Sequence, residues 1–171
     1  MSLDVGLLII RILFGAAIAA HGAQKLFGWF GGYGLMGTGG FFDSLGFKPG
    51  IVFAAAAGLS EFIGGLLLVV GLFAPFGAAA VFAAMIVASI SVHLKNGFFV
   101  QNNGFEPAFL YGAVAIGLAL TGAGAYSLDA ILNLVWLNES SVKIGLLVAS
   151  ALGAAFTLAI RKQPKAQPSI G

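Results

Sequence analysis

The chain has 171 residues, no cysteine, a formal net charge of +2, 60% hydrophobic residues and 8% charged residues. With a mean hydropathy of +1.04 it cannot surround its core with a polar surface, so most of its surface must face lipid. The absence of cysteine excludes disulfides, thiolate nucleophiles and iron–sulfur ligation, and no interleaving of basic and aromatic residues predicts nucleic-acid binding. We expect an all-α, polytopic transmembrane helical bundle in a lipid bilayer.

The first predicted element is a membrane helix over residues 3–27, which is long enough to cross a hydrocarbon core about 30 Å thick. Arg11 is the one charged residue inside its apolar part. Residues 17–19 have the small-x-small form of a signal-peptidase site. Asp4 before the apolar run and Arg11 within it argue against a cleaved signal peptide, so we expect this helix to remain as a span.

The later apolar runs predict four more spans. Residues 28–50 are rich in glycine and aromatic rings and are expected to form a loop that folds back on the bundle. A tight turn is expected at Ala74 and Pro75. Residues 126–141 are too polar for a span but place apolar residues at helical intervals, which predicts an amphipathic interfacial helix. The four spans are residues 51–73, 76–94, 105–123 and 144–160.

These elements divide the chain into three predicted parts. A four-helix transmembrane bundle covers residues 1–125. The interfacial amphipathic segment covers residues 126–141, and a fifth hydrophobic helix with a basic tail covers residues 142–171. The pattern predicts one compact membrane unit, because no charge run or Ser/Pro-rich linker separates the parts.

Charged loop residues predict the orientation in the membrane. If the spans alternate, most basic residues share one face, which the positive-inside rule makes cytoplasmic. The N-terminus would then lie outside and the C-terminus in the cytoplasm. The basic residues on that face are Lys25, Lys48, Lys95, Arg161, Lys162 and Lys165, and the opposite face has Lys143, Asp4, Asp129 and Glu139.

Two ionisable residues lie deep in the first two spans. Such residues are expensive in a membrane and usually have partners. Glu61 has small residues at helical spacing on either side, which indicates a close helix contact. Arg11 comes within side-chain reach of the same depth at a rise of 1.5 Å per residue. We expect a structural ion pair between Arg11 and Glu61 that sets the register of the two helices.

A second polar group is expected at one end of the bundle. His21 and Lys25 share a face of the first span, and His93 lies at a similar height in the third. Each histidine alone is compatible with a hydrogen-bonded interface residue, but their convergence predicts a ligand mouth. The candidate catalytic residues are His21, Lys25, His93 and Glu106. The candidate ligand-binding residues are His21, Gln24, Trp29, His93 and Phe98, and no metal site is predicted.

Three sequence motifs resemble the DoxX family of small bacterial membrane proteins. In order, they are HGAQKLFGWFGGYGLMGTGGFF from residue 21, GLSEFIGGLLLVVGL from residue 58 and VHLKNGFFVQNNGFE from residue 92. The resemblance covers about residues 5–129 and implies a four-helix bundle in the bacterial inner membrane. It also implies similarity to the small membrane subunit of thiosulfate:quinone oxidoreductase and to redox-stress assemblies, hence a redox partner protein. The segment after Asp129 departs from the family pattern.

These observations favour a membrane subunit that binds a quinone or quinol. In that hypothesis His21 and His93 donate hydrogen bonds to a quinone-like head group, Lys25 stabilises negative charge and Glu106 handles a proton. Electrons would come from a partner chain, because the glycines after residue 28 do not form a flavin or nicotinamide fingerprint. A homo-oligomer is compatible with the sequence.

Three other hypotheses remain. Arg11 and Glu61 would serve as a midplane gate in a small-molecule or proton-coupled transporter, although the chain has no evident inverted repeat. A non-catalytic scaffold would use the polar mouth as a docking surface. Haem b held by His21 and His93 is a further alternative, but the charged residues nearby make a wetter site than haem usually has.

Overall fold

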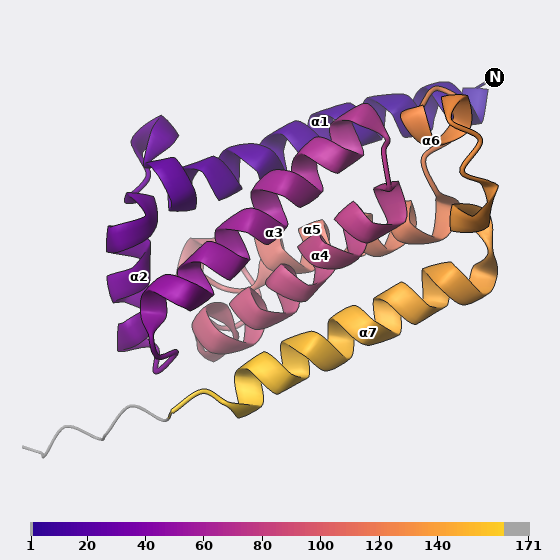
Figure 1. Cartoon of the computed structure of the whole chain (residues 1–171). Coiled ribbons are helices and arrows are strands. Elements are labelled where there is room, and N and C mark those ends of the chain that lie inside the picture. Colours follow the sequence, from indigo (N-terminus) through magenta and orange to yellow (C-terminus); the bar gives the residue numbers. More distant parts are fainter. Residues whose placement is uncertain (1, 163–171) are drawn as a thin grey trace, which may run out of the picture.

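The computed structural model describes residues 2–162, which form helices and connecting turns without a strand. Figure 1 shows the long helices lying alongside one another, with α2 at one end and α6 beside the N-terminal end of α1. The long helices are α1 (Ser2–Phe27), α3 (Gly50–Val70), α4 (Ala74–Ala88), α5 (Glu106–Thr121) and α7 (Ser140–Ala159). The expected all-α transmembrane bundle is confirmed.

Within residues 2–162, four helical stretches are long and apolar enough to cross a membrane. They are α1, α3, α7 and the stretch Ala74–Asn96, in which α4 continues through a π-helical turn, Ser89–His93, and a short 3-10 turn, Leu94–Asn96. The fourth predicted span corresponds to α5, which is apolar but has only 16 residues. Its length is about 24 Å at 1.5 Å per residue, so α5 alone is short for a complete crossing.

The turn between α3 and α4 differs from the prediction. Ala74 and Pro75 lie in the first turn of α4 rather than in a separate tight turn. Proline fits there because the first helical residues need no backbone donor. The chain reverses just before this point, where Gly71 takes the left-handed conformation that ends α3 (φ +67°) and Phe73 also has a positive φ.

Residues 28–50 fold back on the bundle as expected, but the prediction that they form a loop was wrong. They contain the 3-10 turn Trp29–Gly31 and the helix α2 (Gly34–Ser44), which packs against α1 and α3. Glycine weakens an isolated helix. Here it permits close packing, since a Cβ added at Gly50 would lie 2.0 Å from the carbonyl oxygen of Gly39.

The single amphipathic helix predicted for residues 126–141 was also wrong. The structure has two short pieces instead, α6 (Leu128–Ile131) and the 3-10 turn Val135–Asn138. Asn133 has a positive φ of 52°, which breaks the helical repeat between them. The segment is anchored to the bundle by Leu137, which is 1% exposed.

Helices α1 and α3 pack at backbone distance through small residues. A Cβ added at Gly15 would lie 2.6 Å from the carbonyl oxygen of Gly65, and one added at Gly22 would lie 2.4 Å from the amide nitrogen of Phe62. Both contacts are too short for a side chain. Gly15 and Gly22 are seven residues apart, two helical turns, so one stripe of α1 sets its register on α3.

Replacing Gly22 with alanine should lower the free energy of unfolding by about 1 to 3 kcal/mol, because the added methyl group forces the two backbones apart. Gly117→Ala in α5 is the matched control, since a Cβ at Gly117 meets no atom within 4 Å. The control should be neutral or up to about 1 kcal/mol more stable. Unfolding in mixed micelles, followed by circular dichroism, measures both; equal effects would refute the close packing.

The end of α7 joins the end of the bundle where α2 meets α3. The Arg161 guanidinium donates from Nε to the carbonyl oxygen of Leu45 at 2.7 Å and lies 5.7 Å from the ring centre of Phe47. The amide of Lys162 donates to the carbonyl of Gly46 at 2.9 Å. These contacts place the basic end of α7 beside the loop that carries Lys48, as the alternation of spans predicted. Lys165 lies outside the described residues.

Candidate functional site

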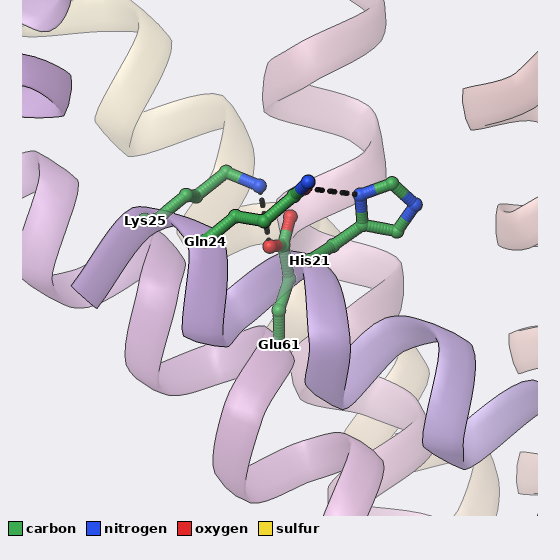
Figure 2. A network of polar contacts seen from close by, with 4 residues as sticks. All are labelled: His21, Gln24, Lys25 and Glu61. Atoms are coloured by element: carbon green, nitrogen blue, oxygen red, sulfur yellow. Dashed lines mark hydrogen bonds and ion pairs between the residues drawn. The ribbon is translucent and has the colours of Figure 1, made fainter. Parts of the chain in front are cut away.

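The last two turns of α1 carry a polar network that reaches into α3. The ammonium group of Lys25 donates a hydrogen bond to Oε2 of Glu61 at 2.5 Å. The side chain of Glu61 is 5% exposed and that of Lys25 is 28% exposed. Figure 2 shows the Glu61 carboxylate turned toward α1, with Lys25 on one side of it and Gln24 and His21 close by. A buried carboxylate therefore has a partly accessible cation as its partner.

The same turns hold His21 in a defined orientation. Nδ1 of His21 lies 3.2 Å from Oε1 of Gln24, and Nε2 of Gln24 donates to the carbonyl oxygen of Phe30 at 3.2 Å. The His21 ring also lies against Tyr111 of α5, with ring centres 5.9 Å apart. His21 itself is exposed. The chain from Phe30 through Gln24 to His21 links the turn after α1 to the face that α1 presents to α5.

The predicted ion pair between Arg11 and Glu61 is wrong. Arg11 is 1% exposed and directs its guanidinium at backbone carbonyl oxygens. Nε donates to Leu68 at 2.9 Å, Nη2 donates to Tyr126 at 2.9 Å, and Nη1 donates to Ala123. Glu61 is paired with Lys25 instead.

The glycine contacts explain why the predicted pair does not form. Glu61 precedes Phe62, which packs against Gly22, whereas Arg11 lies beside Gly71, where an added Cβ would be 2.5 Å from Nη1. The eleven residues from Arg11 to Gly22 span about 16 Å of helix. Measured from the middle of each apolar run, Arg11 and Glu61 have similar depths in the membrane. The close packing of α1 on α3 shifts the two helices along each other, so the two side chains do not meet.

Arg11 and Asp129 hold together the end of the bundle at which α6 lies. We call these two residues, with their hydrogen bonds, the clasp. Arg11 binds carbonyls at the end of α3 and after α5, where a cation is favourable. The Asp129 carboxylate accepts from the amides of Phe73 at 2.7 Å and Ala74 at 3.1 Å, which begin α4. The clasp leaves Arg11 with a structural role. No structural role was predicted for Asp129 from the sequence. Its position in the first helical turn after Ser127, the residue that caps α6, was the signal that could have indicated one.

A groove opens between the end of α1 and α2. Its volume is about 560 Å³. Its lining includes the polar residues Lys25 and Thr38 and the aromatic residues Tyr33 and Phe41; the remaining lining comes from Gln24, Gly31, Gly32 and Gly37. We call this space the Lys25 groove. It is large enough for a single ring system. Lys25, which lines it, is also paired with the buried Glu61 carboxylate.

His93 and Glu106 have their partners in the connection between α4 and α5. Nδ1 of His93 lies 2.9 Å from the carbonyl oxygen of Asn103. The Glu106 carboxylate accepts from the amide of Val100 at 2.9 Å. Both interactions hold the connection in shape. Of the predicted site residues, His21, Gln24 and Lys25 lie together, with His21 bonded to Gln24 and Lys25 to the buried acid Glu61, whereas His93 and Glu106 lie in the connection between α4 and α5.

The two predicted aromatic binding residues lie in separate ring clusters. Trp29 packs against Phe27 at 4.9 Å between ring centres, outside the lining of the Lys25 groove. Phe98 packs against Phe99 and Phe105 at 5.4 and 5.2 Å in the connection that holds His93. The groove walls come instead from Tyr33 and Phe41, which sequence reasoning assigned to a loop.

The helices and their composition define a multi-pass membrane protein with a polar site at one end, and the comparisons place it in a family. The chain belongs to the DoxX family, whose profile matches residues 6–94. "Putative oxidoreductase CatD" of Bacillus subtilis (strain 168) is 33% identical over 128 residues, 75% of this chain and 87% of that protein. An uncharacterised protein of Haemophilus influenzae is 32% identical over 84 residues, 49% of this chain and 56% of its own length. No solved structure matches significantly.

Proposed function

We propose that this DoxX protein is a membrane subunit of a quinone-linked redox system and binds a quinone-like molecule in the Lys25 groove. One observation carries the proposal: Lys25 lines the groove and is bonded to the buried carboxylate of Glu61. An ammonium group has three donors, and one is used by Glu61. The others can reach a ring oxygen in the groove.

The groove fits the chemistry of such a ligand. Tyr33 and Phe41 form apolar walls for a ring, and Lys25 and Thr38 bring hydrogen-bond donors to it. When a quinone gains electrons, negative charge develops on its oxygens, and a fixed cation stabilises that charge. The Lys25 ammonium group would be that cation. Glu61 would accept or return a proton through Lys25.

The electrons would come from a partner redox protein, because the helices of residues 2–162 contain no nucleotide-binding βαβ unit. The B. subtilis relative is named as an oxidoreductase, which supports an association with redox chemistry. We place the protein in the bacterial inner membrane. The basic end with Lys25, Lys48 and Arg161 would face the cytoplasm, following the positive-inside rule.

The transporter alternative loses its proposed gate. Arg11 and Glu61 do not meet, and Arg11 is engaged by three carbonyl oxygens. A guanidinium held in this way has no partner with which to open and close a path. The scaffold alternative remains as an outcome of the binding test below.

Calorimetric titration of the purified protein in nanodiscs with a short-chain ubiquinone analogue tests the proposal. Lys25→Met should weaken binding by roughly 10-fold or more, since a hydrogen bond to a charged group contributes about 1.5 to 3 kcal/mol. Lys48→Met, a neutralised lysine at the same end, is the control and should bind as the wild type does. The absorbance spectrum of the same samples tests the haem alternative.

Two results would contradict the proposal. One is a folded Lys25→Met variant that binds the analogue with wild-type affinity. The other is a wild-type protein that does not bind it, in which case the scaffold function would be favoured. Because Lys25→Met also removes the partner of Glu61, Thr38→Val provides a second groove variant that leaves the ion pair intact, and we expect it to weaken binding about 3-fold.

A further inference from the structure

The orientation of Gln24 determines which nitrogen of His21 carries the hydrogen. Nε2 of Gln24 donates to the carbonyl oxygen of Phe30, so its amide cannot be turned over without losing that bond. The oxygen Oε1 therefore faces His21, 3.2 Å from Nδ1. An amide oxygen only accepts hydrogen bonds, so Nδ1 must be the N–H donor.

The other nitrogen of His21 is therefore an acceptor. A neutral imidazole carries one ring hydrogen, and if it is on Nδ1, then Nε2 presents a lone pair. His93 has the same arrangement, because its Nδ1 lies 2.9 Å from a backbone carbonyl oxygen, that of Asn103. In this tautomer, each neutral histidine offers a ligand an acceptor at Nε2 rather than a donor.

The surroundings of His21 suit an aromatic molecule that approaches from outside the bundle. The His21 side chain is exposed at the end of α1, and Tyr111 lies against it with the two rings inclined at 49°. A ligand ring can pack against these rings while an oxygen at its edge meets Nε2. That oxygen must bring a hydrogen, because a lone pair does not bind a lone pair.

Oxidised and reduced ring compounds differ in this property. A quinone carbonyl has only lone pairs, whereas the hydroxyl of a hydroquinone or another phenol donates a hydrogen bond. We propose that His21 is the acceptor for the hydroxyl group of the reduced form, and that Gln24 is the positioning residue that holds the hydrogen of the neutral ring on Nδ1. This inference rests on the proposed function and adds that His21 recognises the reduced, hydroxyl-bearing form of the ligand. Lys25 lies one turn from His21 on α1 and has only donors, so it can contact either form from the Lys25 groove.

Two duroquinone derivatives separate the hydroxyl hydrogen from ring shape. Duroquinol carries the O–H donors, and its dimethyl ether has the same ring without them. In wild-type protein, duroquinol should bind about 3- to 10-fold more tightly than the ether, the range for one hydrogen bond of roughly 0.5 to 1.5 kcal/mol. His21→Ala should abolish this difference. Lys48→Met, at the same end of the bundle, should preserve it.

Substitutions of Gln24 separate positioning from packing. Gln24→Glu keeps an acceptor facing Nδ1 and should retain the preference for duroquinol, whereas Gln24→Leu should reduce it. Nitrogen-15 NMR of labelled histidine reports the tautomer directly. The His21 signals should show Nδ1–H in the wild type and Gln24→Glu proteins and a shift toward Nε2–H in Gln24→Leu.

Three results would overturn the inference: equal binding of duroquinol and its ether by wild-type protein, a preference that survives His21→Ala, or a wild-type spectrum in which Nε2 of His21 carries the hydrogen. If any of these occurs while duroquinone still binds in a Lys25-dependent way, the proposed function stands and the role of His21 fails. If no ring compound binds, both fail together.

Discussion

Replacing Arg11 with methionine should lower the free energy of unfolding by about 3 to 5 kcal/mol, the largest effect expected of a single substitution in this chain. Arg11 is 1% exposed and donates to the carbonyl oxygens of Leu68, Ala123 and Tyr126. Methionine fills a similar volume but removes the donors to Ala123 and Tyr126 in a region with little water, while the Leu68 carbonyl keeps only its bond from the amide of Gly71 at 3.2 Å. Unfolding in mixed micelles, monitored by circular dichroism, measures the loss.

The chain offers a matched control and an intermediate variant. Arg161 is half-buried and donates from Nε to one carbonyl, that of Leu45, so Arg161→Met should cost no more than about 1 kcal/mol. Arg11→Lys keeps the charge but loses the planar fork that reaches several acceptors at once, and should fall between Arg11→Met and the wild type. If Arg11→Met and Arg161→Met had equal effects, the clasp formed by Arg11 and Asp129 would not be important for stability.

The ion pair between Lys25 and Glu61 should respond unequally to loss of either partner. Lys25→Met leaves a carboxylate that is 5% exposed without its cation, and should cost about 2 to 4 kcal/mol. Glu61→Gln should cost less, roughly 1 kcal/mol, because the partly exposed Lys25 can turn toward water and glutamine can still accept its hydrogen bond. The same unfolding experiment measures both variants.

The double variant Lys25→Met with Glu61→Gln tests whether the two residues act on each other. It removes the unpaired charge and should be more stable than Lys25→Met alone, which gives a coupling energy of about 1 kcal/mol or more. The pair Arg11→Met and Glu61→Gln should be additive, because Arg11 bonds to Leu68 at the end of α3, whereas Glu61 is paired with Lys25 two turns earlier in α3. Strong coupling between Arg11 and Glu61, or none between Lys25 and Glu61, would contradict the structure.

The apolar runs were sufficient to predict the long helices. The runs at residues 3–27, 51–73 and 144–160 correspond to α1, α3 and α7, with ends that differ by only a few residues. This agreement has a simple cause: in lipid, a backbone must satisfy its own hydrogen bonds, so a run of about 20 apolar residues has no alternative to a helix. The three motifs also identified the family correctly.

Hydropathy failed where helix formation depended on contacts. The glycines of α2 predict a loop, yet α2 is a helix because Gly39 and Gly50 allow it to lie directly on the chain that begins α3. In the segment after α5, apolar spacing predicts a continuous helix, but Asp129 turns inward to bind the first amides of α4. Neither outcome follows from local spacing, because each depends on a partner distant in sequence.

The candidate site shows the same division between local and long-range information. His21, Gln24 and Lys25 could be grouped from sequence because residues three and four apart share a helix face. Their partner Glu61 could not be assigned, because its level against α1 depends on how Gly22 meets Phe62. The amino-acid sequence alone is therefore enough for the membrane class, the long helices and the polar stripe on α1. Tertiary packing decides which buried charges meet, since a register defined by glycine contacts moves Glu61 away from Arg11 and next to Lys25.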